Sequence, residues 1–448
     1  MKKKSQFWGH WLYRIIYAYA SVIHRFYYRK ITVVGLEKIP ADTPVLFAPN
    51  HQNALMDALA VLFAARKPVG FLARADIFKK PAIAKTLNLL KILPIYRIRD
   101  GVEQLGRNQE VFENTIDVLN SNTPICILPE GNHEGKKQLR SLKKGIFRIA
   151  FQAEASTDFR LNLHIIPVGL DYSDYFNPGS DLVVVFGKPI KVADYATQYL
   201  ENEQKTVHNL MSLLAESMRS VMIHIPEENY ELIYNISEIY EPNVWNTCNV
   251  KRHPFKKLTI LQYIVQKATE AFSRSPEKEA ELQHELSAYT KKLNQRGLND
   301  CDLQQKAPLG LPVLLELAFT ILLLPVHVYG MILNYLPYKI PVWLAAKIKD
   351  KHFKSSLQFG ISLLLFPVSY LIILIAFAFF TEGSLFILLF GISLPVTGLF
   401  AFYNYKNIRL LAGKLKLYAI RLTNITEYKA IYNDRTHLID QIKNLINS

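Results

Sequence analysis

Short apolar runs alternate with longer periodic segments over the first half of the chain. The periodic segments repeat apolar residues every three or four positions at 77–90, 102–119 and 142–155, which predicts helices. Strands that alternate with helices in this way are typical of an α/β domain with a largely parallel sheet flanked by helices. We expect this domain to cover 31–225, with strands at 31–34, 45–48, 70–73, 94–96, 124–128, 163–168 and 181–186.

The N-terminal residues 1–30 carry an apolar stripe of helical spacing that includes Trp8 and Trp11. Lysine and arginine occur repeatedly here, whereas no acidic residue occurs before Glu37. A basic, aromatic-rich amphipathic helix suits the headgroup region of a membrane, so we predict an interfacial helix. The alternative is a helix that packs on its own domain. Because Arg14 interrupts the apolar stretch and no small-residue cleavage site follows, we do not expect a signal peptide.

Two apolar stretches near the end of the chain, 357–380 and 385–403, are each long enough to cross a bilayer. Glu382 is the one charged residue between Ser355 and Tyr405, which predicts a membrane hairpin with a tight turn. Lysines and arginines flank the hairpin on both sides. This distribution indicates that both ends face the cytoplasm, where we also expect the α/β domain.

The stretch 309–336 is also apolar, but Glu316 and Pro325 divide it. We expect it to dip into one leaflet or to pack under the α/β domain, because a full crossing would move the basic loop that follows away from the cytoplasm. After the α/β domain we therefore expect a helical linker at 226–308, membrane segments at 309–405 and a basic helical tail at 406–448.

The 448-residue chain has a formal net charge of +15 at pH 7 and is 50% hydrophobic. A strongly basic chain favours a polyanionic partner, either nucleic acid or an anionic membrane surface, and the long apolar stretches decide for the membrane. A transporter or channel is disfavoured, because these stretches carry almost no ionisable residue to mark a pathway. Three scattered cysteines, Cys126, Cys248 and Cys301, support neither a disulfide framework nor a zinc site.

Candidate chemistry begins directly after the apolar run 45–48. Pro49 ends the run, Asn50 and His51 follow, and Asp57 lies near the start of the next helical pattern. An imidazole titrates near neutral pH, and a carboxylate can fix its tautomer and stabilise its protonated form, so the pair can activate a hydroxyl group. A histidine and an aspartate at this spacing also occur by chance, so the pair needs support from other loops.

Three further loops carry polar residues at predicted strand ends, where open α/β sheets bind ligands. Arg74 and Arg97 follow two of the strands, and arginine suits bidentate phosphate contacts, although such residues are more often ordinary surface residues. In the last loop, Gly131 lets backbone amides approach an anion. Glu130 and His133 have the Glu-x-x-His spacing of a carboxylate-bridged metal site, but the motif occurs once, and we expect no metal. A basic cluster follows at Lys136, Lys137, Arg140, Lys143 and Lys144.

In their order along the chain, these residues resemble the motifs of the glycerophospholipid acyltransferase family, which includes glycerol-3-phosphate and lysophosphatidic acid acyltransferases. The resemblance covers residues 31–220. Four blocks carry it, namely Asn50-His51 through Asp57, Leu93-Pro94-Ile95-Tyr96-Arg97, Leu128-Pro129-Glu130-Gly131 and Ile165-Ile166-Pro167-Val168.

The resemblance implies a membrane-bound enzyme of phospholipid biosynthesis that makes lysophosphatidic or phosphatidic acid. His51 would act as general base on a glycerol hydroxyl, Asp57 would orient it, and the alkoxide would attack an acyl thioester without a covalent enzyme intermediate. The thioester would be acyl-CoA or acyl carrier protein, and no cofactor is expected. The acceptor phosphate would be bound by Arg97, Glu130 and Gly131, with Arg74 or Lys143 in support, while Asn50, Pro129, His133 and Pro167 would support the motifs.

Two departures from the family pattern matter. Five residues separate His51 from Asp57 where the family has four, and on one continuous helix the two side chains would lie about 240° apart. The extra residue must therefore be absorbed in the turn, with Asn53 capping the helix. His133 stands where the family's commonest form has arginine, a feature of a glycerol-3-phosphate branch, which favours glycerol-3-phosphate as acceptor.

The altered spacing keeps a second interpretation open, in which the chain is a catalytically silent lipid-binding or membrane-tethering protein with the same fold. Within the enzyme interpretation, the acceptor can be glycerol-3-phosphate, a lysophospholipid or an amino-lipid.

Overall fold

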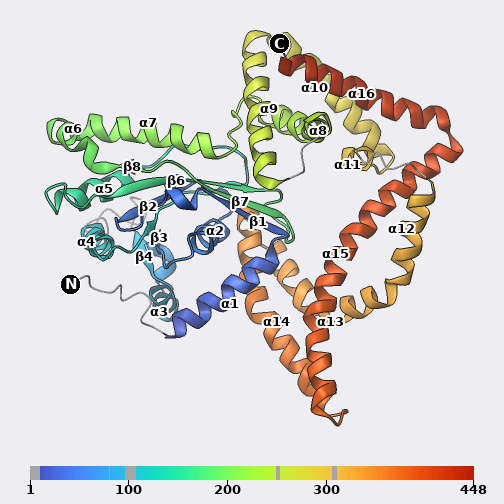
Figure 1. Ribbon diagram of the computed structural model, residues 1–448, viewed down its shortest axis with the longest axis horizontal. Helices are drawn as coiled ribbons and strands as arrows, with labels where there is room; N and C mark the ends of the chain where they lie inside the picture. Colours follow the sequence, from blue (N-terminus) through green and yellow to red (C-terminus); the bar gives the residue numbers. More distant parts are fainter. Residues whose placement is uncertain are drawn as a thin grey trace. The chain divides into compact units, whose positions relative to one another are not determined.

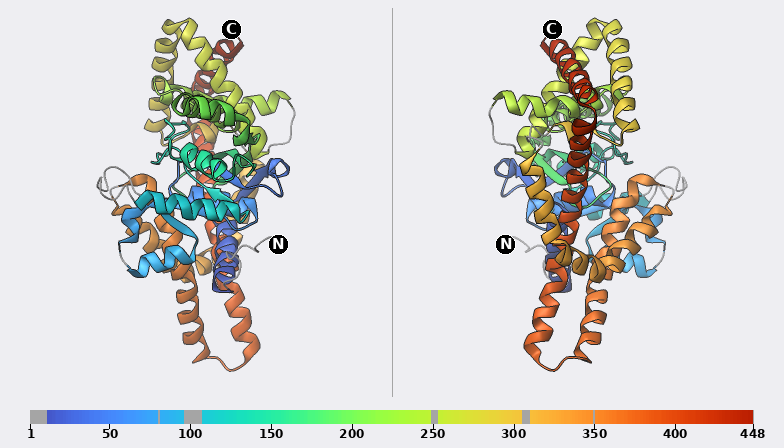
Figure 2. Two further views of the ribbon diagram at one scale, coloured as in Figure 1. Left: turned by 90° about the vertical axis from the view of Figure 1, so that its left-hand side faces the viewer. Right: turned by 90° about the vertical axis from the view of Figure 1, so that its right-hand side faces the viewer.

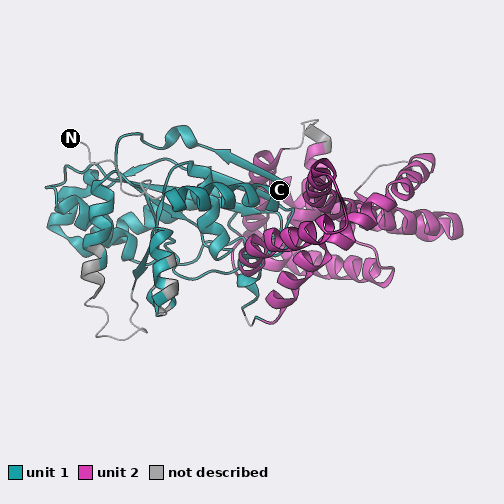
Figure 3. Ribbon diagram, turned by 90° about the horizontal axis from the view of Figure 1, so that it is seen from below, with its two compact units in different colours: residues 1–224, 348–356 teal, residues 225–347, 357–448 magenta. Residues whose placement is uncertain are grey.

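The computed structural model describes residues 11–79, 81–95, 107–248, 253–304, 310–348 and 350–447. The chain forms two compact units (Figure 3), one made of residues 1–224 with 348–356 and the other of residues 225–347 with 357–448. The first unit contains the predicted α/β domain. Residues 348–356 thus belong to the first unit, although the chain first leaves that unit after His224.

The described residues of the first unit contain one eight-stranded sheet. Its strands are β1 (Lys30–Val34), β2 (Val45–Pro49), β3 (Gly70–Arg74), β4 (Ile92–Ile95), β5 (Ile125–Cys126), β6 (His164–Tyr172), β7 (Asp181–Phe186) and β8 (Ile190–Lys191). They lie in the order β1-β7-β6-β2-β5-β3-β4, and β8 pairs with β6. The β6 strand is antiparallel to β7 and β8, whereas the other neighbouring pairs are parallel. The prediction of a largely parallel sheet is confirmed.

Helices cover both faces of this sheet (Figure 1). They are α1 (Trp11–Tyr27), α2 (Leu55–Ala65), α3 (Pro81–Leu89), α4 (Arg107–Asn120), α5 (Gly145–Ala155), α6 (Ala196–Glu201) and α7 (Glu203–Val221). On one face, Phe147 of α5 and Leu210 of α7 join Leu46 of β2 in a buried cluster. Phe47 contacts Phe186, with 5.5 Å between the ring centroids. A strand buried on both faces carries a continuous apolar run, which explains the pattern at 45–48.

The largest difference from the predicted strand bounds occurs where pairing changes direction. The β6 strand continues to Tyr172 instead of ending at 168, because beyond Val168 it pairs with the antiparallel strand β7. The sequence could not indicate this extension, since Asp171 interrupts the apolar run. Of the helix predicted over 102–119, the structure describes the part that begins at Arg107, and residues 102–106 lie outside the described residues.

The α1 helix packs on the first unit with one side only. Tyr13 and His24 are buried, and the His24 ring lies 4.9 Å from the ring of Phe63 in α2. The opposite side of the helix is exposed and carries large apolar residues. Its large apolar residues are Trp11, Ile15, Val22 and Phe26, with exposed fractions of 51 to 68%. The two interpretations of this helix, packing on its own domain and lying on a membrane, are therefore compatible.

The described part of the second unit consists of helices and their connections. The helices are α8 (Tyr230–Cys248), α9 (Pro254–Arg274), α10 (Pro276–Gln295), α11 (Asp300–Leu303), α12 (Leu311–Leu322), α13 (Leu324–Ala346), α14 (Lys354–Ala378), α15 (Ser384–Thr423) and α16 (Ile425–Asn447). The first residues of α14, up to Ser356, are assigned to the first unit.

Two of these helices, α14 and α15, are long enough and apolar enough to cross a membrane. Figure 2 shows them as the two legs of a hairpin. Near the turn, the rings of Phe377 and Phe390 stack with 4.0 Å between their centroids. The α15 helix has 40 residues and runs well beyond the predicted span 385–403, so the first part of the predicted tail belongs to the same helix.

The apolar stretch predicted to dip into one leaflet forms α12 and α13, which are bent by 52° at the break between them. Such a bend fits either a broken span or a re-entrant segment. Pro325 lies in the first turn of α13, where its missing N–H costs no helical hydrogen bond. Glu316 pairs with Lys414 of α15, with 2.6 Å between Oε2 and Nζ. The carboxylate that interrupts the apolar pattern is thus paired inside the second unit.

Candidate active site

The candidate site lies in the first unit, in the loop that joins β2 to α2. Asn50 fixes the start of this loop to β6, because its Nδ2 donates to the Leu170 carbonyl at 3.0 Å and its Oδ1 accepts from the Leu170 amide at 2.7 Å. The Asn50 side chain therefore continues the hydrogen bonding of the sheet past the end of β2. The next residue, His51, is held at the carboxyl end of a central strand.

His51 and Asp57 form a direct pair, with 2.9 Å between Nδ1 and Oδ2. The Asp57 side chain is fully buried, and that of His51 is 13% exposed. Because a carboxylate only accepts hydrogen bonds, Nδ1 of His51 carries the proton and Nε2 is left to accept one. The predicted pair is therefore formed in the geometry that a general base requires.

Further hydrogen bonds compensate for burying the Asp57 carboxylate. Oδ2 accepts from the amides of Gln52 and Asn53, each at 2.7 Å, and Oδ1 accepts from the Tyr172 hydroxyl at 2.8 Å. Burial and the neighbouring Asp57 raise the pKa of Tyr172, which keeps the phenol protonated as a donor. Sequence reasoning did not include Tyr172, because it lies 115 residues away in the part of β6 that was not predicted.

The five-residue spacing is absorbed in the turn, as expected, but Asn53 does not cap the helix. The α2 helix begins at Leu55, and its N-cap residue is Ala54, which makes no side-chain capping bond. Ala54 has a φ of +45°, a backbone conformation that residues with a Cβ rarely adopt. The Asn53 side chain instead contacts the Tyr175 carbonyl, at 3.1 Å from Nδ2. The Asn53 prediction is wrong because its Oδ1 accepts from Ser355, while the amides at the start of α2 donate to other acceptors.

Glu130 supports the His51 loop from a second loop. Oε1 accepts from the His51 amide at 2.7 Å, and Oε2 accepts from the Arg140 amide at 3.2 Å and from Arg140 Nε at 3.1 Å. The Glu130 side chain is fully buried. Burial raises the pKa of the Glu130 carboxyl, while the hydrogen bonds from His51 and the charge of Arg140 oppose that rise. Both carboxyl oxygens thus already have partners inside the protein.

Gly131 and Lys143 lie together beside this carboxylate. Gly131 has a φ of +69°, and a Cβ added there would lie 3.4 Å from Lys143 Cγ. The Lys143 amide donates to the carbonyl of Pro129 at 2.7 Å, which joins the two ends of the loop. Lys143 is exposed, whereas Lys137 is buried and pairs with Asp171. Of these two lysines, Lys143 is the one whose position suits binding of an anion from solvent.

His133 lies next to the pair of His51 and Asp57, with its ring centroid 5.2 Å from that of His51. Its Nε2 is 3.2 Å from Oδ2 of Asp350, a residue in the late segment of the first unit. Burial and the nearby His51 lower the pKa of His133, whereas Asp350 opposes this shift. The third motif therefore brings a second imidazole to the mouth of the site.

Three predicted residues are less fully described or lie further from the pair. Arg97 lies outside the described residues, and for Arg74 the structure describes only the backbone, at the end of β3. Pro167 is a β6 residue that pairs with Ala48 of β2. It therefore belongs to the strand beneath the site. Among the described residues, no group of three or more His, Cys, Asp and Glu could hold a metal ion.

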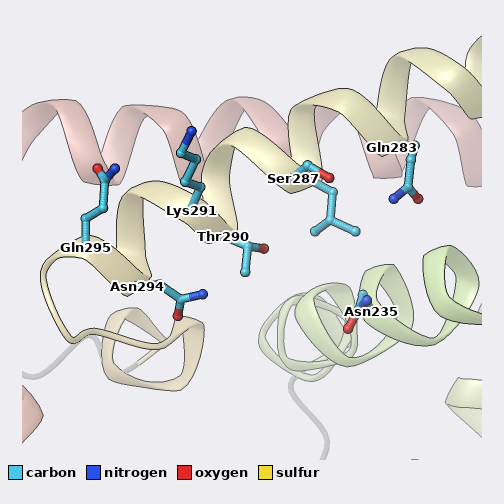
Figure 4. A pocket seen from close by; sticks show the side chains of 8 residues that line it. Asn235, Gln283, Ser287, Thr290, Lys291, Asn294 and Gln295 are labelled. Carbon is cyan, nitrogen blue, oxygen red and sulfur yellow. The ribbon is translucent and has the colours of Figure 1, made fainter.

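A hollow of about 660 Å³ lies in the second unit, between residues of α8 and α10 (Figure 4). The residues that line it contain amides, hydroxyls and one lysine, but no histidine and no carboxylate. They cannot supply an acid and base pair of the kind that His51 and Asp57 form. The lining residues are Asn235, Gln283, Leu286, Ser287, Thr290, Lys291, Asn294 and Gln295.

The model of the acyltransferase family matches residues 30–171, which run from β1 into β6 and contain the His51 and Asp57 pair. This part of the chain is thus similar to an acyltransferase domain, which agrees with the resemblance drawn from the four motif blocks. Among solved structures, the chain is similar to the 1-acyl-sn-glycerophosphate (LPA) acyltransferase PlsC from Thermotoga maritima. The sequence identity is 16% and the TM-score 0.33, over 46% of this chain and 80% of that chain.

Proposed function

We propose that this protein transfers a fatty acyl group from an acyl thioester to a hydroxyl of glycerol-3-phosphate or 1-acylglycerol-3-phosphate. The observation that carries the proposal is the hydrogen bond between His51 Nδ1 and Asp57 Oδ2. Nε2 of His51 takes the proton of the acceptor hydroxyl, and the oxygen forms a bond to the thioester carbonyl carbon. The thiolate then leaves and takes up a proton, while Asp57 stabilises the charged imidazole between these steps.

The acceptor is bound through its phosphate at the loop that contains Gly131. Lys143 is exposed beside this loop and provides a positive charge. Arg97 and Arg74 remain the proposed bidentate ligands. Glu130 acts here through His51 and Arg140, since its carboxyl oxygens contact those two residues. The imidazole of His133 in place of an arginine favours glycerol-3-phosphate over its acylated form.

The donor is acyl-CoA or acyl carrier protein, since both present the same thioester and no further cofactor enters the reaction. The product is a lipid, which agrees with the two helices that are long enough to cross a membrane. The basic net charge and the exposed apolar side of α1 support a catalytic unit that lies on the cytoplasmic membrane surface.

The silent tether is the weaker interpretation. It rested on the five-residue spacing between His51 and Asp57, which would have separated the two side chains on one continuous helix. In the folded chain the turn at Ala54 brings them within hydrogen-bond distance. A protein without catalytic activity would not need a buried carboxylate aligned on an imidazole by four donors.

The test is acyl transfer from radiolabelled acyl-CoA to glycerol-3-phosphate and, in parallel, to lysophosphatidic acid. The assay compares membranes that contain the wild-type protein, His51→Ala or His208→Ala, the last replacing an exposed histidine of α7 as a control. We expect one acceptor to be acylated by the wild type and by His208→Ala but not by His51→Ala. If His51→Ala retains full activity, the proposed mechanism is wrong.

A further inference from the structure

The late segment of the first unit, residues 350–356, contacts both loops of the site. Asp350 pairs with His133, and His352 Nδ1 accepts from the Gly135 amide at 2.9 Å. Both contacts reach the loop that contains Glu130. The other end of the segment reaches the His51 loop. The segment therefore bridges two loops that come from the ends of different strands.

Ser355 and Ser356 make the contacts with the His51 loop. The Ser356 hydroxyl accepts from the Leu55 amide at 3.1 Å and donates to the Asn53 carbonyl at 3.4 Å. The Ser355 hydroxyl donates to Oδ1 of Asn53. Both serines are buried, at 1% and 2% exposure. Ser356 thus provides the cap for α2 that Ala54 cannot provide.

The turn needs this support because its backbone conformation is unfavourable. Ala54 has a φ of +45° and a ψ of −122°, and non-glycine residues in such regions cost on the order of 1–3 kcal/mol. Such a conformation persists only where the surrounding structure fixes it. Asn53 is fixed on two sides, by Ser355 and by the Tyr175 carbonyl. This loop, which is one residue longer than the family pattern, is therefore held by a segment far along the chain.

We propose that Ser355 and Ser356 are positioning residues of the acyl-transfer site, which hold the Asn53–Ala54 turn so that Asp57 reaches His51. This inference rests on the function proposed above. The amide of Asn53 donates to the Asp57 carboxylate, so a displaced turn also displaces the carboxylate. Neither serine contacts His51 or Asp57 directly in the described contacts, and both act through Asn53 and Leu55.

The test replaces both serines by alanine in the full chain, in phospholipid nanodiscs. The matched control is Ser362→Ala, six residues further along the same α14 helix. We expect the double variant to lose about tenfold or more in kcat, with the KM of acceptor and acyl-CoA changed less than twofold, because the base is misaligned and the substrate contacts remain. A general loss of folding would instead reduce the amount of active enzyme in proportion to the unfolded fraction, which circular dichroism measures.

Hydrogen exchange by mass spectrometry provides a readout that does not need activity. We expect the amides of Gln52 and Asn53 to exchange about tenfold faster in the double variant, while the peptide that covers β7 is unchanged. If the double variant does not fold, Ser355→Ala alone removes the contact to Asn53 and leaves the Ser356 cap, and it should show the same changes in smaller measure.

The outcomes separate this proposal from the proposed function. Wild-type kcat and wild-type exchange in the serine variants, together with an inactive His51→Ala, would overturn the positioning role and leave the acyltransferase mechanism intact. If the wild type itself transfers no acyl group to any acceptor, the proposed function fails. The exchange rates then still decide whether the serines hold the turn.

Discussion

Two histidines of the first unit lie in opposite surroundings, one in the loop after β2 and one on the inner side of α1. His51 is partly exposed and donates to a carboxylate that four donors hold in place. His24 is buried between the rings of Phe63 and Tyr28, with centroid distances of 4.9 and 5.0 Å. Burial lowers the pKa of His24 to about 3. The difference shows that the surroundings of a histidine, and not the residue type, determine whether it is suited to act as a base or to pack in the core.

The largest expected effect is on the His51 side of this comparison. His51→Ala removes the general base and should lower kcat by about 10³-fold, within the range that general bases contribute. The melting temperature should fall only moderately, because the buried Asp57 carboxylate loses one hydrogen bond and keeps its three other donors. His24→Ala should do the reverse and leave kcat per folded molecule near the wild-type value. Acyl transfer and thermal unfolding of both variants provide the measurements, and equal losses of kcat would contradict the comparison.

Glu130→Gln tests the second loop that holds His51. The amide NH2 of glutamine would face Arg140, so both hydrogen bonds from Arg140 and the ion pair are lost while the size of the side chain is kept. We expect kcat to fall by roughly 10- to 100-fold, as for loss of a hydrogen bond to a charged group. Glu134→Gln, on the exposed part of the same loop, is the control. An unchanged kcat would show that the Arg140 contact does not position His51.

The buried His24 should make stability depend on pH. Its pKa in the folded protein, about 3, is below its ordinary value of 6.5, so under pH 6.5 the unfolded chain binds a proton that folded His24 does not. Stability is therefore lost as pH falls, by about 2 kcal/mol between pH 6.5 and pH 5. His24→Phe should lose less stability over this interval than the wild type. Thermal unfolding at pH 7.5 and pH 5 measures this, and parallel curves would be the contrary result.

A smaller change is expected from Tyr172→Phe. The variant removes the donor to Asp57 Oδ1 but leaves the His51 contact to Oδ2. Loss of one partner of a buried group costs about 1–3 kcal/mol, so we expect kcat to fall about tenfold. Tyr175→Phe removes a hydroxyl that donates to Gln52 instead, and it serves as the control. Equal kcat values for these two variants would mean that Asp57 is held by its own loop alone.

The smallest effect concerns the backbone of the His51 loop. Ala54→Gly should raise the free energy of unfolding by about 1 kcal/mol, because glycine adopts a positive φ without the steric cost of a Cβ. Ala60→Gly, in the regular part of α2, should lower it by a similar amount. Thermal unfolding of the two variants measures both effects, and a destabilising Ala54→Gly would show that the turn is not strained.

The sequence predicted those features that depend on neighbouring residues. The strand that ends at Pro49, the pair of His51 and Asp57, and the apolar hairpin all follow from local patterns, and the family match and the structure agree with them. Tyr172 and Ser355 could not be found in this way, because they reach the site across 115 and 302 residues of chain. Such contacts depend on how the strands are ordered in the sheet.

The buried carboxylates show where local reasoning fails. Glu130 was expected to help bind phosphate because of the family resemblance, and it lies in a loop at a strand end, a position shared by ligands and by internal supports. Its two oxygens contact His51 and Arg140, and no spacing along the chain distinguishes that arrangement. Asn53 was predicted as a cap from its residue type, but its Oδ1 accepts from Ser355, and the amide of Leu55 at the start of α2 donates to Ser356.

The late segment also sets an order of events during synthesis. A ribosome releases residues 1–224, with the whole sheet, long before Ser355 and Ser356. Domains generally fold from the N-terminus as the chain emerges. The sheet can therefore form early, while the turn at Ala54 acquires its last two hydrogen-bond partners only when α14 has begun to emerge. A nascent or truncated chain would contain His51 and Asp57 but lack the two serines, so we expect the pair to be fully aligned only after α14 has begun to emerge.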